Sequence, residues 1–491
     1  MRVLKLLFVV VVLILLSRVG ILWGSHNLNV SSEANDLYGT LMLADGKPLY
    51  PVRTQVPYNV YLYLPVHAYL GAGLVWLSGV RELHRQVFLV RGLSLLALAV
   101  AFAFLWRTVL APLKVDWKSS AAVLILASPK LADYASAARN DTLALCFEMM
   151  ALSFFVNWLG RRRGVDFFLF LAVSFLSLWT RQSGVVFVSA MFYLLWHREY
   201  RRTLVTTGGF FVVSVGAFFL LWRQTHGAII DHVFLSNIRA WRSINSQLFD
   251  PSLVGFFLSY VAFSLCVVAG VKPALQRRND PVVRMLALVF FSSFCFAVAV
   301  FMRAGGDVNY FFETILAGVY FAVLGWQRLS DSASRLVRTG LAVGLAFQLV
   351  AISGLYLAKD RSAMHDGSRP FDRISERLRT EIPRYGYVIG PYSEMMSVYL
   401  RGWLFQGPDV TSGSWVSRNS HKSMRSLVGS LHHAMGDGTV NVIVDTTPGC
   451  GAVWETLGGA RSEWFKEKEV WDSGVCLFRS KLSPHLSPPF G

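Results

Sequence analysis

The stretch "YNVYLYLPVHAYLGAGLVWLSGV", residues 58–80, decides how this chain is arranged in a membrane. It is apolar and as long as a membrane-spanning helix, which needs about 20 residues. Pro57 stands directly before it and Pro65 interrupts it, and proline removes a backbone donor from a helix. If this stretch crosses the membrane, every later loop changes side, so its status has to be settled from the rest of the chain.

The composition is that of a membrane protein. The chain has 491 residues, of which 54% are hydrophobic and 16% charged, whereas soluble domains contain about 25% charged residues. The basic and apolar N-terminus has no small-residue cleavage site, which favours a retained helix over a signal peptide. Apolar runs predict helices at 3–23, 88–108, 119–135, 141–159, 166–180, 183–197, 204–223, 252–271, 285–302, 308–326 and 339–357.

The net charge of +17 comes largely from short basic clusters between these runs. Positive loops stay on the cytoplasmic side, and all of the dense clusters share one side only if residues 58–80 do not cross. We therefore interpret 58–80 as a horizontal or re-entrant segment within a first outer loop, 24–87. This interpretation predicts about eleven transmembrane helices, a cytoplasmic N-terminus and an inner-membrane location, and it disfavours nucleic acid as a partner.

The chain changes character near residue 359. Residues 1–358 form the predicted membrane module, and 359–491 are polar with short apolar runs. "YGYVIG", "TVNVIVD" and "EVWDSGVCLF" predict strands, whereas "SEMMSVYLRGW" and "MRSLVGSLHHAMGD" predict helices. We expect a small soluble α/β domain on the outer side, where Cys450 and Cys476 either pair or stay free.

This topology gathers polar residues from distant parts of the sequence at the outer face. Ionisable residues at membrane depth are costly and commonly functional, so we predict a polar substrate site there. Its candidate residues are Glu33, Asp36, Arg139, Asn140, Asp141, Arg181, Arg303, Asn309, Tyr310 and Glu313.

Several of these residues have simpler explanations. Asn140 and Asp141 could cap the following helix, and Arg139 and Arg303 could contact lipid headgroups. Glu313 requires a partner inside its apolar run, which could be a structural cation or the substrate.

Five sequence elements resemble those of the C-type membrane glycosyltransferases, a superfamily that includes the protein O-mannosyltransferases and the aminoarabinose transferases of lipid A. The order of the elements and their predicted common side carry the resemblance, which covers residues 1–330. Many members have Asp-Glu where this chain has Ser32-Glu33, so Glu33 and Asp36 both remain candidates for the catalytic acid. The elements are "SSEANDLYGTLMLADGKPLYP", "PYNVYLYLP", "ARNDTLAL", "TRQSG" and "GGDVNYFFETILA".

The resemblance implies an inverting transfer of a sugar from a polyprenyl-phosphate carrier to an acceptor hydroxyl, outside the cytoplasm. Glu33 fills the family position of the base, with Asp36 as the alternative. Arginines suit the leaving phosphate because a guanidinium binds phosphate through two hydrogen bonds, and Arg181, Arg303 and Arg139 are at the expected depth.

Other properties stay open at this stage. The sugar is unknown, and the acceptor is a glycan, a lipid or a protein. No metal-ligand set is evident, so a divalent cofactor is neither assigned nor excluded. The rival interpretations are a transporter or flippase of a lipid-linked glycan, which predicts internal repeats, and a non-catalytic member of the fold.

Overall fold

The computed structural model describes residues 33–51, 61–112, 117–234, 251–302, 308–332 and 339, together with five short strands between 386 and 480. The chain forms two compact parts. The first comprises residues 1–24, 91–217 and 239–361, and the second comprises 25–90, 218–238 and 362–491. Each part is described by itself below.

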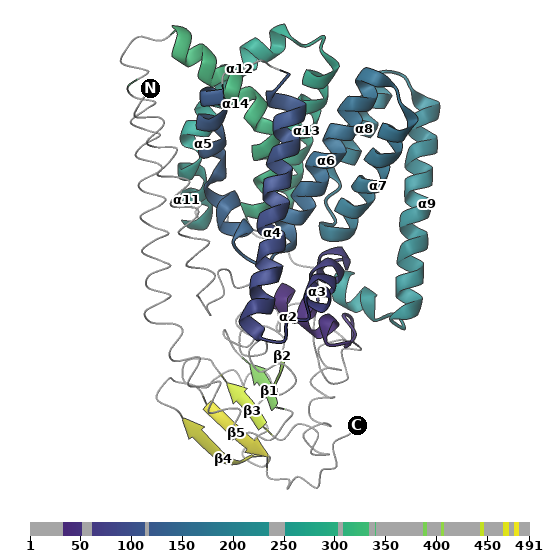
Figure 1. The fold of residues 1–491 in the computed structure, drawn as a ribbon, viewed down its shortest axis with the longest axis vertical. Coiled ribbons are helices and arrows are strands. Elements are labelled where there is room, and N and C mark those ends of the chain that lie inside the picture. The colour runs from purple at the N-terminus through teal and green to yellow at the C-terminus, as the bar shows by residue number, and fades with distance from the viewer. Residues whose placement is uncertain are drawn as a thin grey trace. The chain divides into compact units, whose positions relative to one another are not determined.

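The first part is a bundle of helices (Figure 1). Within the described residues, six helical segments are long and apolar enough to cross a membrane, namely Leu83–Leu110, Asn140–Arg161, Gly164–Arg181, Tyr200–Gln224, Pro281–Phe301 and Val308–Asp331. The helices are α4 (Leu83–Leu105, continued by a π turn at Trp106–Leu110), α5 (Trp117–Ala135), α6 (Asn140–Arg161), α7 (Gly164–Arg181), α8 (Val185–Trp196), α9 (Tyr200–Gln224), α11 (Pro251–Ser259), α12 (Val261–Gln276), α13 (Pro281–Phe301) and α14 (Phe312–Ser332, after a 3₁₀ turn at Val308–Phe311).

Each predicted apolar run within the described residues is helical, but one run forms two helices instead of one. The predicted span 252–271 divides into α11 and α12 at Tyr260. The Tyr260 hydroxyl accepts the Lys130 N–H at 3.2 Å and lies 3.4 Å from the Ala127 carbonyl, which fastens the break to α5. The predicted spans 3–23 and 339–357 lie outside the described residues, apart from residue 339, and the total of about eleven crossings stays a prediction.

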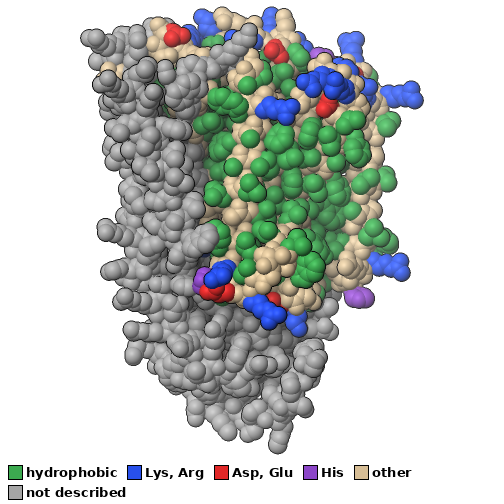
Figure 2. Space-filling view, viewed as in Figure 1, with side chains coloured by type: hydrophobic (Ala, Val, Ile, Leu, Met, Phe, Trp, Pro, Cys, Tyr) green, Lys and Arg blue, Asp and Glu red, His purple; other side chains and the backbone are tan. Residues whose placement is uncertain are grey.

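Burial separates the helices into central and peripheral ones. In the segment Val308–Asp331, which contains α14, 94% of the most apolar stretch is buried. The reason is that α5, α6, α12 and α13 pack around α14. In α9 the buried share is only 11%, and large apolar side chains such as Leu204, Phe211 and Leu220 are exposed. Figure 2 shows this apolar face in green. In a membrane protein such a face contacts the lipid chains.

Helices α12 and α14 touch backbone to backbone. A Cβ atom on Gly270 would lie 1.8 Å from the Phe321 carbonyl oxygen, and one on Gly325 would lie 1.8 Å from the Cys266 carbonyl oxygen. Glycine is therefore required at both positions, as is common where membrane helices approach closely.

Three basic connections meet at one end of the bundle, as the positive-inside argument requires. Arg162, between α6 and α7, pairs with Glu199 before α9 at 3.2 Å. Arg284 at the start of α13 lies 3.5 Å from His197 at the end of α8. Blue side chains gather at this end in Figure 2.

The second part contains two short helices, α2 (Glu33–Ala44) and α3 (Val66–Ser78), which pack on each other. Helix α3 begins after Pro65 and ends at Gly79, which has a φ of 66°. With 13 residues it is shorter than the roughly 20 that cross a hydrocarbon core of about 30 Å. Its length agrees with the interpretation of 58–80 as a segment that does not cross.

The five described strands form one sheet with the order β2-β1-β3-β5-β4. Strand β1 pairs in parallel with β2 and β3, whereas β5 pairs antiparallel with β3 and β4. The strands are β1 (Gly386–Ile389), β2 (Leu404–Gln406), β3 (Val442–Asp445), β4 (Phe465–Val470) and β5 (Cys476–Ser480).

Two predicted strands, "YGYVIG" and "TVNVIVD", contain β1 and β3. The third, "EVWDSGVCLF", was wrong as a single strand, because it spans the end of β4, a connection and the start of β5. Its Gly474 and Asp472 are turn-forming residues. The predicted helices after residue 390 and Cys450 lie outside the described residues, so the α/β domain stays a prediction.

Candidate functional site

The first element of the site is the start of α6. Arg139 occupies the N-cap position in an extended conformation without a side-chain cap, and Asn140 and Asp141 are the first residues of the helix. The interpretation of Asn140 and Asp141 as caps is therefore wrong. Their side chains turn to other helices, and Asn140 Nδ2 donates to the Thr180 carbonyl at 3.4 Å.

The Asp141 carboxylate is buried and accepts from three donors. Oδ2 accepts from Arg139 Nε at 2.7 Å, while Oδ1 accepts from Arg181 Nε at 3.1 Å and from Asn309 Nδ2 at 2.7 Å. Arg139 is 2% exposed, so it is not a headgroup anchor. Charge-assisted bonds of this kind are short and strong, and they fix both guanidinium groups.

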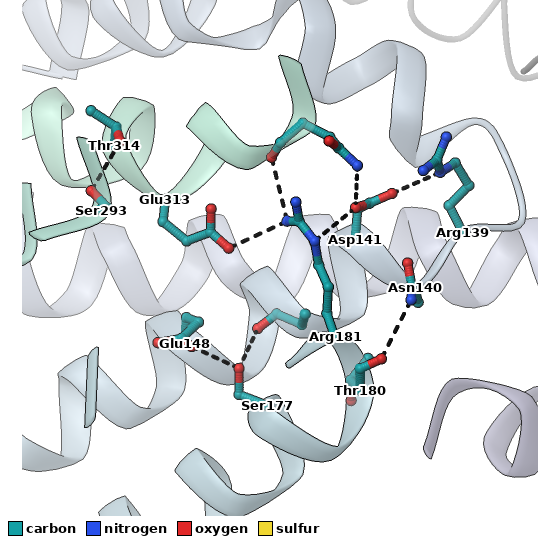
Figure 3. Close-up of polar contacts among 12 residues, drawn as sticks. Arg139, Asn140, Asp141, Glu148, Ser177, Thr180, Arg181, Ser293, Glu313 and Thr314 are labelled. Atoms are coloured by element: carbon teal, nitrogen blue, oxygen red, sulfur yellow. Dashed lines mark hydrogen bonds and ion pairs between the residues drawn. The ribbon is translucent and has the colours of Figure 1, made fainter. Parts of the chain in front are cut away.

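Arg181 is the centre of the cluster, between Asp141 and Glu313 (Figure 3). Its Nη1 lies 3.4 Å from Glu313 Oε1 and 3.3 Å from the Asn309 carbonyl. The guanidinium carbon lies 4.3 Å from the centre of the Tyr310 ring, a favourable cation–π distance. Glu313 thus has the partner that its apolar surroundings require.

A tight connection between α7 and α8 presents Arg181. Helix α7 ends at Arg181, and Gln182 follows with a φ of 61°. Gly184 has a φ of 58° and precedes α8. The "TRQSG" element therefore reverses the chain within three residues and leaves the arginine at the end of its helix.

The cluster combines two cations with two acids. Arg139 and Arg181 face Asp141 and Glu313, and all four side chains are buried. A phosphate entering this site would compete with the two carboxylates for the guanidinium donors. A buried ion pair needs further hydrogen bonds to offset its desolvation, and Asn309 supplies one of them.

Asn309 offers a further polar atom. Because its amide nitrogen donates to Asp141, its Oδ1 is the free acceptor, and that atom is buried without a hydrogen-bond partner among the described residues. An acceptor held in this way can bind a hydroxyl group of a ligand.

Glu33 and Asp36 lie in the second part, in the first turn of α2, and both are fully buried. A helix N-terminus favours negative charge. Burial and then the nearby Asp36 carboxylate raise the pKa of the Tyr61 hydroxyl well above its ordinary value. Tyr61 Oη is itself buried and has no partner among the described residues.

A histidine fastens the chain next to these acids. The Tyr61 N–H donates to His232 Nδ1 at 3.1 Å, and His232 Nε2 lies 2.7 Å from the Pro51 carbonyl. An amide can only donate and a carbonyl can only accept, so the ring is neutral with its proton on Nε2. The sequence pattern around His232 did not indicate this role.

The structure thus brings together seven of the ten predicted site residues within the first part. Glu33 and Asp36 belong to the second part, and Arg303 lies outside the described residues. Sequence reasoning missed Ser94, which exchanges hydrogen bonds with the Arg139 backbone at 3.1 and 3.2 Å. No cluster of three or more His, Cys, Asp or Glu side chains suited to a metal occurs in the part of the chain that the structure describes. The seven are Arg139, Asn140, Asp141, Arg181, Asn309, Tyr310 and Glu313.

Comparison with known proteins gives a family match and several similar structures. Residues 64–222 match the family described as dolichyl-phosphate-mannose-protein mannosyltransferase. The crystal structure of ArnT from Cupriavidus metallidurans bound to undecaprenyl phosphate is similar over 96% of this chain and 97% of that one, with a TM-score of 0.60 and 14% identity. Its apo state gives the same coverage and TM-score with 15% identity.

The archaeal oligosaccharyltransferase AglB from Archaeoglobus fulgidus, in complex with an inhibitory peptide and a dolichol-phosphate, matches 98% of this chain and 75% of that one. Its TM-score is 0.51 and its identity 12%. No curated protein matches the chain. The resemblance inferred from the sequence is confirmed: the chain is a multi-pass membrane protein with the fold of the C-type glycosyltransferases, and its residues 64–222 match a mannosyltransferase family.

Proposed function

We propose that this protein is an inverting glycosyltransferase that moves a sugar from a polyprenyl-phosphate carrier to an acceptor hydroxyl on the non-cytoplasmic face of the membrane. The observation that carries the proposal is the buried cluster of Arg139, Asp141, Arg181 and Glu313. It lies at helix ends in a chain whose fold is similar to those of ArnT bound to undecaprenyl phosphate and of AglB in complex with a dolichol-phosphate.

We assign the side of the membrane from the charges at the two ends of the helices. The connections α6–α7 and α8–α9 carry the exposed arginines, and basic loops stay in the cytoplasm. The connections α5–α6 and α7–α8 carry Asp141 and Arg181 and therefore face outward. The same reasoning supports a cytoplasmic N-terminus and an exported α/β domain.

The chemistry requires one base and a stabilised leaving group. As the acceptor oxygen attacks the anomeric carbon, its proton passes to a carboxylate, and the bond between that carbon and the phosphate oxygen breaks. Glu33 is the proposed base, with Asp36 as the alternative. The electron pair of the broken bond goes to the leaving polyprenyl phosphate, whose charge Arg181 and Arg139 stabilise.

The remaining polar residues would hold the donor sugar. Asn309 Oδ1 is a buried acceptor oriented by Asp141, and it suits a sugar hydroxyl. The ring of Tyr310 faces the Arg181 guanidinium in a cation–π contact. Arg303, which the sequence analysis also assigns to the phosphate, stays a candidate.

A reconstitution assay tests this proposal. Purified protein in lipid nanodiscs is mixed with short-chain polyprenyl phosphates carrying mannose, arabinose, glucose or aminoarabinose, and with candidate acceptors. We expect transfer from one donor, with the anomeric configuration inverted, and a loss of at least about 100-fold in kcat for Glu33→Gln or Arg181→Ala.

Matched controls come from exposed residues of the same parts. Glu82→Gln and Arg161→Gln remove charges at the surface and should leave the rate unchanged. Normal turnover in both Glu33→Gln and Asp36→Asn would refute the proposed base. Movement of the lipid across the bilayer without turnover would instead favour a flippase.

A further inference from the structure

The buried acid Glu148 is absent from the site described above. It lies on α6, seven residues after Asp141 and hence two helical turns further along the same face. Its relative exposure is 1%. A carboxylate in the middle of a membrane helix is costly, so its contacts should explain why it is there.

Glu148 bridges the two helices that flank the Arg181 turn. Its Oε1 accepts the Ser177 hydroxyl of α7 at 2.8 Å, and its Oε2 accepts the Val186 N–H of α8 at 2.9 Å. Figure 3 shows the first of these bonds beside Arg181. Both partners donate, so both oxygens act as acceptors.

The two partners stand on either side of the reversal. Ser177 lies one turn before Arg181 on α7, and Val186 is the second residue of α8. The first N–H groups of a helix have no partner within the helix, and Glu148 provides one for Val186. One side chain thereby joins the end of α7 to the start of α8.

We propose that Glu148 is a positioning residue that holds the "TRQSG" reversal, and with it the Arg181 guanidinium, in the orientation needed to bind the leaving phosphate. This inference rests on the proposed function. Arg181 contacts both Asp141 and Glu313 from its place at the end of α7. Loss of the bridge lets the reversal shift, and a displacement of about 1 Å at a catalytic group can cost about 100-fold in rate.

The test is a double-mutant cycle between Glu148→Gln and Arg181→Ala in the transfer assay. Glutamine keeps the shape and one acceptor but places an amide opposite a donor. We expect Glu148→Gln alone to lower kcat about 10- to 100-fold with little change in KM for the acceptor. In the Arg181→Ala background it should lower kcat less than twofold, because residues that act as a unit are not additive.

Ser177→Ala provides a second route to the same answer if Glu148→Gln does not fold. It removes the hydrogen bond between Ser177 and Glu148. It should lower kcat in the wild-type background and leave kcat unchanged in the Arg181→Ala background. Ser174→Ala is the matched control, since Ser174 is a buried serine one turn earlier on α7 whose hydroxyl has no partner among the described residues. It should behave as wild type.

Fully additive losses would overturn the proposal and leave Glu148 as a general stabiliser of the bundle. Unchanged kcat in both Glu148→Gln and Ser177→Ala would overturn it as well. If the wild type transfers no sugar from any donor, the proposed function fails separately. The same cycle is then measured through binding of short-chain polyprenyl phosphate, where non-additivity supports the bridge and additivity refutes it.

Discussion

At the scale of single residues, the decisive feature is that each arginine of the cluster already has a carboxylate partner. Arg181 is shared between Asp141 and Glu313, so the proposed phosphate ligand would compete with both carboxylates for the guanidinium. The pair distances differ, because the contact with Asp141 is 3.1 Å and that with Glu313 is 3.4 Å. Asp141 is also held by Arg139, whereas the ion-pair partner of Glu313 among the described residues is Arg181.

Replacement of Glu313 by Gln should strengthen the binding of polyprenyl phosphate. The change removes one negative charge beside Arg181 while keeping the side-chain shape, so the guanidinium attracts the phosphate more strongly. We expect the Kd for a short-chain polyprenyl phosphate to fall about threefold to tenfold, whereas Arg181→Ala should raise it at least about tenfold. Titration by isothermal calorimetry measures both, with Asp331→Asn as an exposed control. A weaker complex in Glu313→Gln would contradict the competition.

Tyr61 should make the protein sensitive to alkali. Its folded pKa is raised by burial and then by Asp36, while the unfolded phenol ionises near pH 10. Above that pH the unfolded chain releases the proton and the folded chain retains it, so the free energy of unfolding falls as the pH rises. Tyr61→Phe should lose part of this dependence, and exposed Tyr69→Phe should keep it. Unfolding midpoints between pH 9 and 11 provide the measurement, and identical slopes in all three proteins would disprove the effect.

At the scale of elements, the contact between α12 and α14 is the least tolerant. Cβ atoms at Gly270 or Gly325 would lie 1.8 Å from a carbonyl oxygen of the facing helix. Backbone atoms cannot rotate away, so the helices must separate and lose contacts along their length. Packing density in protein interiors leaves little room for such a shift.

Gly270→Ala and Gly325→Ala should each destabilise the protein by about 3 kcal/mol or more, at the upper end of overpacking effects. Gly208→Ala on α9 is the matched control, because a Cβ there meets nothing within 4 Å and alanine favours helix over glycine. When thermal unfolding is measured in detergent, Gly270→Ala and Gly325→Ala should have lower midpoints than the wild type. Gly208→Ala should have an unchanged or higher midpoint. If both Gly270→Ala and Gly325→Ala unfold at the wild-type midpoint, the close approach of α12 and α14 is contradicted.

At the scale of the whole molecule, the sequence predicted where helices form better than how they meet. Apolar length and basic clusters are local properties, so the helical runs and the shared end of Arg162, Glu199 and Arg284 were foreseeable. The break at Tyr260 was not foreseeable, because the hydroxyl contact with α5 that accompanies it joins segments far apart in the sequence. Partners such as Asp141 for Arg181 depend on packing between distant segments.

The site shows the same division. Residue types and their depth predicted the cluster, but the choice between a helix cap and an ion pair for Asp141 required tertiary contacts. The Glu148 bridge was likewise invisible, since its partners are a serine and a backbone amide. Neither a serine nor a backbone amide can be identified from residue type alone as the partner of a buried acid.

The proposed topology places residue 82 outside the cytoplasm and residue 162 inside it. Single cysteines introduced at these exposed positions, in a background without the native cysteines, should react differently with a membrane-impermeant maleimide. We expect labelling at 82 in intact cells and labelling at 162 only after permeabilisation. The reverse pattern would mean that residues 58–80 cross the membrane and that the Asp141 cluster faces the cytoplasm.

The imidazole of His232 closes a ring in the chain without a covalent bond. It links the Pro51 carbonyl to the Tyr61 amide, so residues 51–61 are tied at both ends to one side chain, much as a disulfide staples a loop. Unlike a disulfide, this link is broken by the addition of one proton. A hydrogen on His232 Nδ1 would face the Tyr61 N–H, so the Tyr61 amide would lose its acceptor. Protonation of the imidazole would therefore remove the contact that joins the Tyr61 amide to the Pro51 carbonyl through one side chain.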